Sequence, residues 1–175
     1  EINNKLDEMA ESGELENLIG QYIELMTTYV YNNIEEMKEA TNLVNGSFAR
    51  TSGFYEFNDG GGAYYKIRNV TNEDVIDNVI IIALSDNTLV AELINPVEIR
   101  PEIFGAVGDG ETNDSDAFSK MFNYVLSKQT LAGYTYVTAP KMILTKKYYI
   151  NNINIPDDLE KFNIDGQGSG YITNG

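Results

Sequence analysis

The chain has 175 residues and carries 27 Asp and Glu against 12 Lys and Arg, which gives a formal net charge of −15. This acidic balance argues against nucleic acid and anionic membranes as partners, because both attract basic surfaces. The lack of Cys and His excludes disulfides, zinc–thiolate sites and a Ser–His–Asp triad. No apolar run approaches the roughly 20 residues that cross a membrane, but 42% hydrophobic residues suffice for a buried core.

Residues 1–44 are predicted to be helical and to form an anchoring and trimerisation segment, interrupted at Gly13. Beyond Gly13, apolar residues recur at alternating steps of four and three, which is a heptad-like pattern. An ordinary amphipathic helix with one buried face gives the same pattern. The length of the run, its acidic opposite face and the polar Asn33 favour self-association, because a polar seam residue fixes helix register. The predicted seam consists of Leu15, Ile19, Tyr22, Met26, Tyr29, Asn33 and Met37.

Residues 45–100 are predicted to form a small β-module. Aromatic residues at 54–57 precede a glycine-rich turn and the stretch 63–67, which is the pattern of a β-hairpin. Residues 79–84 and 89–93 are expected to form a second pair of strands. The turn lacks the Lys-Ser/Thr pair and the strand–helix context of a phosphate-binding loop, so a nucleotide site is disfavoured. Its residues are Asp59, Gly60, Gly61 and Gly62.

Residues 101–175 begin with a glycine-rich loop and continue into a predicted helix at 115–127, for which Asp114 is a suitable N-cap. Short strands separated by turns follow, and their length and spacing are typical of a β-solenoid. They are expected at residues 134–138, 142–144, 148–150, 153–155 and 162–164. The carboxylates of Asp109, Asp114 and Asp116 raise the alternative of a calcium loop. Their spacing fails the EF-hand pattern, and a turn before a capped helix accounts for all three.

The segment at 104–118 resembles the opening of the pectate-lyase-3 family, which reads aromatic-Gly-Ala-x-Gly-Asp-Gly-x-x-Asp-Asp-Thr-x-Ala. Asn113 and Ser115 stand where that pattern has Asp and Thr, and Pro140 and the turn at 165–168 correspond to later family features. The matching residues are Gly105, Ala106, Gly108, Asp109, Gly110, Asp114 and Ala117. The resemblance implies a right-handed parallel β-helix with a helix capping its N-terminal end, where apolar surface and strand edges would otherwise be exposed.

Two further segments resemble parts of phage tail fibres and appendages. Residues 6–18 look like a helix–Gly–helix found near the N-termini of such proteins, and residues 53–67 look like their aromatic, Asp-Gly-Gly hairpin. This resemblance implies a homotrimer in the virion, whose N-terminal part attaches to other tail or neck proteins. It also implies that a distal β-helix faces the glycan of the host cell wall.

The sequence therefore predicts a mixed fold. It comprises an N-terminal α-helical oligomerisation segment at 1–44, a small β-module at 45–100, and a capping helix with the first coils of a right-handed parallel β-helix at 101–175. The predicted function is that of a virion structural protein, the attachment and trimerisation part of a tail spike or appendage. One alternative is part of a polysaccharide or teichoic-acid depolymerase with its active site beyond residue 175; another is a cellular pectate-lyase-like protein. No residue is assigned a catalytic, cofactor-binding or metal-binding role.

Overall fold

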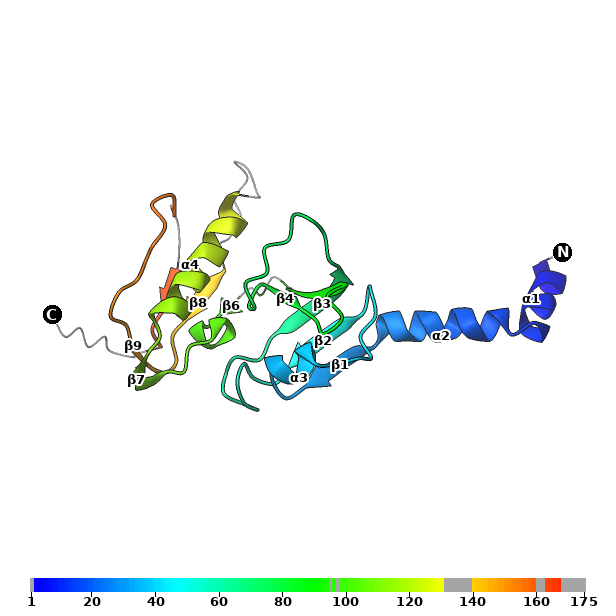
Figure 1. The fold of residues 1–175 in the computed structure, drawn as a ribbon, viewed down its shortest axis with the longest axis horizontal. Helices are drawn as coiled ribbons and strands as arrows, with labels where there is room; N and C mark the ends of the chain where they lie inside the picture. Colours follow the sequence, from blue (N-terminus) through cyan, green and yellow to red (C-terminus); the bar gives the residue numbers. More distant parts are fainter. Residues whose placement is uncertain (1, 95, 97, 131–139, 160–162, 168–175) are drawn as a thin grey trace.

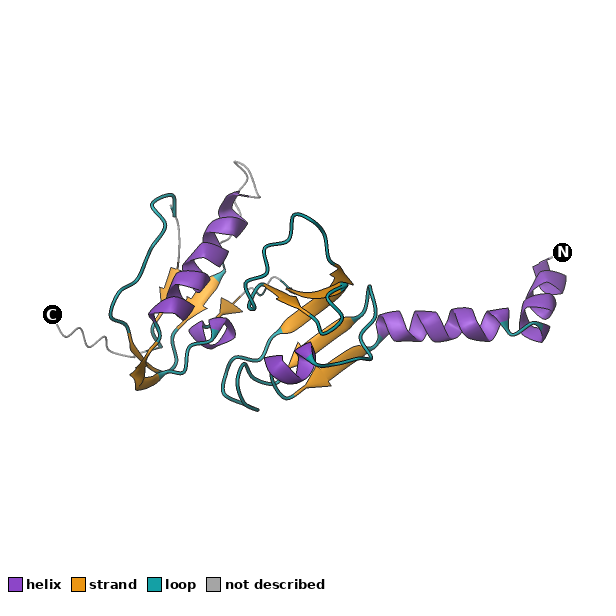
Figure 2. Cartoon of the chain, in the orientation of Figure 1, coloured by secondary structure: helices purple, strands orange, loops and turns teal. Residues whose placement is uncertain are grey.

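The computed structural model describes residues 2–94, 96, 98–130, 140–159 and 163–167. Two helices project from the body of the protein, a five-stranded sheet with a short helix follows, and a set of parallel strands lies beside a long helix (Figure 1, Figure 2). We refer to residues 28–94 as the sheet module and to residues 98–167 as the parallel-strand unit.

The projecting helices are α1 (Ile2–Glu11) and α2 (Glu14–Met26). Gly13 adopts a φ of 76° between them and ends α1, because glycine tolerates this left-handed conformation. In Figure 1, α2 extends away from the sheet module and α1 turns off at its far end. Within the residues that the structure describes, no helix is long and apolar enough to cross a membrane.

The prediction of helix as far as residue 44 is wrong beyond Met26. Thr28–Tyr31 forms strand β1, because its β-branched and aromatic side chains favour extended backbone. The short helix α3 (Ile34–Lys38) follows and packs against the sheet. The sheet module thus begins well before residue 45, and the apolar spacing in this stretch reflects contact with a sheet.

Three residues of the predicted seam serve the sheet module. Tyr29 lies in β1, and Met37 is fully buried in the core. Asn33 is the N-cap of α3: its Oδ1 accepts a hydrogen bond from the Glu36 amide at 2.8 Å, and Glu36 Oε2 accepts one from the Asn32 amide at 2.6 Å. Asn33 thus caps α3, and Glu36 holds the residue before the cap, which explains the polar residue in the predicted seam.

The five strands of the sheet module run in the order β1-β2-β3-β5-β4. The strands after β1 are β2 (Phe48–Thr51), β3 (Tyr64–Asn69), β4 (Ile81–Ala83) and β5 (Leu89–Leu93). β1 pairs with β2 in parallel, and all other pairs are antiparallel. The predicted pairing of the strands near 79–84 and 89–93 is confirmed by β4 and β5. One face buries Ala49, Tyr65, Ile67 and Leu93 against α3 and the surrounding loops.

The predicted hairpin has a different first strand: β2, at residues 48–51, takes the place of residues 54–57. Residues 54–57 are not a strand; β2 pairs with β3 instead, and residues 52–63 form the long connection between them. Asn58 and Gly60 in this connection have φ values of 63° and 98°. The aromatic residues favour a strand by propensity, but the amide groups of this stretch turn inward to the Asp59 carboxylate and cannot join a ladder.

Parallel strands stack in the C-terminal part of the described chain. The strands β6 (Glu98–Ile99), β8 (Lys141–Ile143) and β10 (Asn163–Asp165) form one sheet, and β7 (Asp109–Asn113) pairs with β9 (Lys147–Tyr149) in another. Ile99, Met142 and Ile164 are in register, so apolar side chains lie one above another. Residues 153–155 form no strand, contrary to prediction. The strand predicted at 134–138 lies outside the described residues.

The predicted helix after Asp114 is confirmed as α4 (Ser115–Thr130), which follows the 3₁₀ turn η1 (Pro101–Phe104). Its apolar face packs on η1 and β9: the rings of Phe104 and Tyr124 lie 5.5 Å apart, and those of Phe118 and Tyr148 lie 5.2 Å apart. The sheet module and this unit share one continuous hydrophobic core.

Candidate functional site

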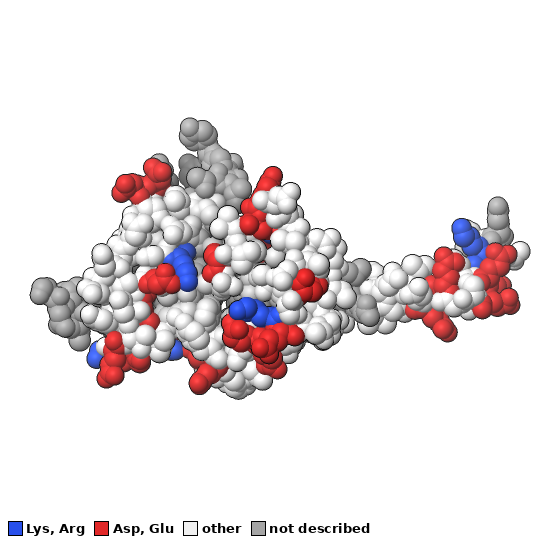
Figure 3. Space-filling view, in the orientation of Figure 1, with Lys and Arg blue, Asp and Glu red and all other residues white. Residues whose placement is uncertain are grey.

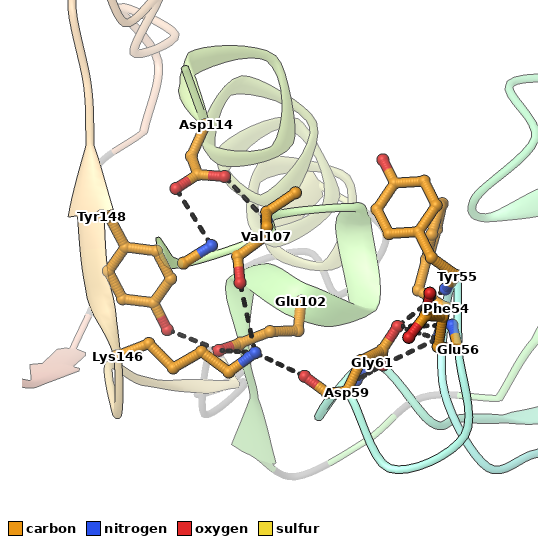
Figure 4. Close-up of polar contacts among 11 residues, drawn as sticks. Phe54, Tyr55, Glu56, Asp59, Gly61, Glu102, Val107, Asp114, Lys146 and Tyr148 are labelled. Carbon is orange, nitrogen blue, oxygen red and sulfur yellow. Dashed lines mark hydrogen bonds and ion pairs between the residues drawn. The ribbon is translucent and has the colours of Figure 1, made fainter. Parts of the chain in front are cut away.

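The two glycine-rich loops that the sequence singles out lie on opposite sides of the boundary between the sheet module and the parallel-strand unit (Figure 4). The 52–63 connection comes from the sheet module, and the loop that precedes α4 comes from the other unit. We call the contact between them the junction. Its central residues are Asp59, Gly61, Glu102, Lys146 and Tyr148.

Asp59 organises the sheet-module side of the junction. Its carboxylate accepts hydrogen bonds from the amides of Phe54, Tyr55 and Glu56 at 2.7 to 3.1 Å, and from the amide of Gly61 at 2.8 Å. Partial burial raises the pKa of Asp59, but these amide donors outweigh it and hold that pKa below its ordinary value. The turn is therefore built around one ionised carboxylate.

The glycines after Asp59 allow the turn to approach η1 closely. A Cβ on Gly61 would lie 2.5 Å from the backbone oxygen of Glu102 and 2.6 Å from the Cβ of Phe54. Gly60, with its φ of 98°, also faces the Glu102 side chain, and Gly62 lies against the backbone of Thr51 and Ser52 at the end of β2. Gly60 and Gly61 therefore reflect contact between two units, which hairpin chemistry alone does not require.

Sequence reasoning missed the other half of the junction, which consists of Glu102, Lys146 and Tyr148. Glu102 is 1% exposed, and its Oε1 accepts a hydrogen bond from the Tyr148 hydroxyl at 2.8 Å. The Lys146 ammonium lies 3.8 Å from that oxygen and donates to the backbone oxygens of Asp59 at 2.5 Å and Val107 at 3.2 Å. One cation thus joins both loops to a buried carboxylate (Figure 4).

The buried Glu102 carboxylate affects the pKa of Tyr148 and has one oxygen that lacks a hydrogen-bond donor among the described residues. Burial raises the pKa of Tyr148 well above its ordinary value, and the Glu102 charge adds to that effect, so the tyrosine donates its proton to the hydrogen bond and keeps it. Glu102 Oε2 is buried and accepts no hydrogen bond from the described residues. Removing the lysine cation would leave this carboxylate more poorly compensated, since buried charges need partners.

The loop before α4 is held by Asp114, but in a different way from the one predicted. Asp114 sits at the position before α4, yet its carboxylate accepts hydrogen bonds from the amides of Val107 at 2.8 Å and Gly108 at 3.3 Å. At the start of α4, Asn113 Oδ1 accepts from the Ser115 amide at 3.0 Å. Burial raises the pKa of Asp114 despite these amide donors. Asp114 therefore closes the loop, and Asn113 contacts the helix start.

The remaining motif residues have local roles. Asp109 accepts from the amides of Glu111 and Thr112, which lowers the pKa of Asp109 to about 2. Asp116 pairs with Lys120 at 2.7 Å. Gly105, Gly108 and Gly110 all have positive φ, and Ala106 and Ala117 are buried. The three aspartates weighed as calcium ligands therefore face different partners.

A further contact ties the loops together. The Tyr55 hydroxyl donates to the backbone oxygen of Gly105 at 3.0 Å, and the Phe54 ring lies against the same glycine. Glu102 is buried between the loops, close to residues of both structural units. In the described part of the chain, the junction connects the sheet module to the start of the parallel-strand unit.

We expect Gly61→Ala to destabilise the protein by roughly 2–3 kcal/mol, because the new methyl group must push two backbone segments apart. The measurement is urea unfolding followed by circular dichroism. Gly20→Ala is the matched control, because a Cβ there meets nothing within 4 Å and alanine favours the α2 helix. An equal loss in both variants would contradict the close contact at Gly61.

Comparison with known proteins finds similarity of fold alone. No protein-family model and no curated protein sequence matches the chain. Full-length tailspike protein 2 from an Escherichia coli O157:H7 bacteriophage superposes with a TM-score of 0.54 and 16% identity, over 77% of this chain and 16% of that one. The enzymatically active domain of the same tailspike gives a TM-score of 0.53 and 16% identity, over 87% and 21%.

A third structure, Pantoea stewartii WceF, is described as a glycan biofilm modifying enzyme with a tailspike-like parallel β-helix fold. It matches with a TM-score of 0.49 and 13% identity, over 67% of this chain and 16% of that one. The chain thus spans about one fifth or less of the length of these proteins. With the two phage structures it shares a fold that includes parallel stacked strands, which agrees with the solenoid predicted from the sequence.

Proposed function

We propose that this chain is the attachment and trimerisation part of a phage tail spike or appendage, located in the virion and continued by a right-handed β-helix. The observation that carries the proposal is the apolar stripe on α2, in a chain whose body has a tailspike-like fold. Ile19, Tyr22 and Ile23 are 50%, 65% and 59% exposed although they share one helix face. A stripe of this kind becomes stable in water when it meets the same stripe on other copies.

The proposal shortens the predicted seam to α2. Leu15, Ile19 and Tyr22 lie on one face of the helix, and Met26 is its last residue. A helical bundle of three copies would hold the sheet modules together at one end. The acidic helix α1, which turns away at Gly13, is free to contact other tail or neck proteins. A β-helix continuing from β10 would face host cell-wall glycan.

The test is the mass of the protein in solution. We expect the chain to be a trimer by light scattering, and Ile19→Asp to convert it to monomers, because a buried carboxylate opposes seam packing. Asn17→Asp adds the same charge on the opposite face of α2 and should leave the trimer intact. A monomeric wild-type chain, or equal effects of both variants, would overturn the proposal.

A second candidate, part of a glycan depolymerase, is favoured by one observation: one matching phage structure is an enzymatically active domain. Of the carboxylates at the junction, Glu102 is buried and Asp59 is saturated with amide donors. For residues 1–175 we therefore propose a supporting role in either case, with any cleavage carried out by other parts of the spike.

A further inference from the structure

The sheet module has a second face that lies opposite α3. Strand registers place Val30, Arg50 and Tyr64 side by side across β1, β2 and β3, and the amide of Ile94 bonds to the Tyr64 backbone oxygen. Side chains alternate between the faces of a sheet, and the neighbours of these residues, Ala49 and Tyr65 among them, point into the core. We call the row Val30, Arg50, Tyr64 and Ile94 the outer row.

The outer row is exposed and mostly apolar. Val30, Tyr64 and Ile94 are 60%, 54% and 39% exposed. The Arg50 guanidinium lies over the Tyr64 ring, 5.6 Å from its centroid. The other end of the same face is closed, since Val90 is buried and Arg68 is bound to Asp74 in the loop that follows β3. The open part is therefore confined to one end of the sheet.

The charge of the outer row differs from that of the chain. Arg50 and, in the next row, Lys66 are exposed cations in a protein with a net charge of −15. The opposite side of the module carries α3, where Glu35, Glu36 and Glu39 are exposed. Figure 3 shows acidic side chains gathered over α3. One side of the module thus carries Arg50 and Lys66 beside apolar side chains, and Glu92 on that side is bound to Arg68. The other side carries three exposed glutamates, of which Glu35 is paired with Lys38.

We propose that the outer row of one copy packs against the α3 side of the next copy, so that three sheet modules join head to tail around the α2 bundle. This inference rests on the proposed trimer and names a contact within it. Two different patches on each subunit form a heterologous interface, which is what a three-fold ring requires. The α2 bundle sets the number of copies, and the charges of Arg50 and the α3 glutamates determine which faces of the sheet modules meet.

The immediate link between α2 and β1 supports this arrangement. Only Thr27 separates the last residue of α2 from the first residue of β1, the strand that carries Val30. Helices that associate through their stripe therefore hold the sheet modules of neighbouring copies close to one another. Side-chain cations over aromatic rings are also favourable contacts at interfaces, where Arg and Tyr are enriched.

The test is a charge exchange between Arg50 and Glu39 in the full 175-residue chain. We expect Arg50→Glu alone and Glu39→Arg alone each to raise the concentration at which trimers dissociate by about tenfold, and the double variant to restore it. Arg50 and Glu39 lie on opposite sides of one module, so a direct contact between the exchanged charges can form only between copies. Arg100→Glu, an exposed change outside the sheet module, is the control.

The outcomes separate this inference from the trimer itself. A wild-type trimer that Ile19→Asp dissociates, combined with no effect of Arg50→Glu, would overturn the head-to-tail contact and leave the α2 bundle standing. Equal effects of Arg50→Glu and Arg100→Glu, or failure of the double variant to recover, would also overturn the contact. A monomeric wild-type chain would overturn both. Circular dichroism of each variant confirms that the modules are folded.

Discussion

Replacing Lys146 with Met is expected to destabilise the body of the protein by about 3 kcal/mol. The Lys146 ammonium is the cation beside Glu102, a carboxylate that is 1% exposed, and it donates to the backbone oxygens of Asp59 and Val107. Met fills a similar volume without charge or donors. The loss therefore combines an uncompensated buried charge with two backbone oxygens that lose their donor.

Urea unfolding monitored by circular dichroism measures this loss, and Lys147→Met is the matched control. Lys147 is exposed, so its replacement should change the free energy of unfolding by less than about 0.5 kcal/mol. Combining Lys146→Met with Glu102→Gln should recover part of the stability, because the glutamine oxygen still accepts from Tyr148 and carries no charge. A double variant as unstable as the sum of the single variants would argue against a coupled pair.

Replacing Asp59 with Ala is expected to cost about 3 kcal/mol at neutral pH. Four backbone amides of the 52–63 connection donate to this carboxylate, and alanine leaves all four without an acceptor. Because the same turn contacts Glu102 and Lys146, its collapse also weakens the junction. Thermal and urea unfolding measure the change.

Asp59→Asn is the graded control, since it keeps one acceptor oxygen and loses the charge, and we expect a smaller loss of stability than for alanine.

The stability that Asp59 contributes also depends on pH. The amide donors lower the pKa of Asp59 in the folded state, so its contribution is complete above the unfolded-state pKa of about 4 and is lost as the pH falls through the lower folded value. The difference in stability between wild type and Asp59→Ala should shrink below pH 4; a constant difference would rule out the ionised carboxylate as its source.

Local chemistry made several features predictable from the sequence. Gly13 lies between two segments with helical apolar spacing and marks the break between α1 and α2. The break is predictable because it requires only one residue with a positive φ. The helix after Asp114 and the pairing of β4 with β5 follow from periodicity and turn residues. The short strands predicted after residue 140 include those near β8 and β10, which pair in parallel.

Other features depended on partners that are distant in the chain. Tyr29 and Met37 fit a helical seam by spacing, but a sheet that includes β3 and β5 competes for the same side chains and buries Met37. Residues 54–57 have strand composition, but Asp59 draws their amides into a turn. Non-local burial outweighs intrinsic propensity in these cases, because propensity differences amount to about 1 kcal/mol or less per residue.

The sequence by itself determined the order of the parts: acidic helices, a small β-module, and a glycine-rich loop leading into a helix and parallel strands. It also marked glycines with special requirements, such as Gly105, which has a positive φ, and Gly61, which has no room for a Cβ. Only the tertiary structure decided what these residues are for. Glu102 and Lys146 are 44 positions apart and carry no local signal, yet they meet at the junction. Burial of a charge is set by what surrounds it in space, and no spacing along the chain encodes that.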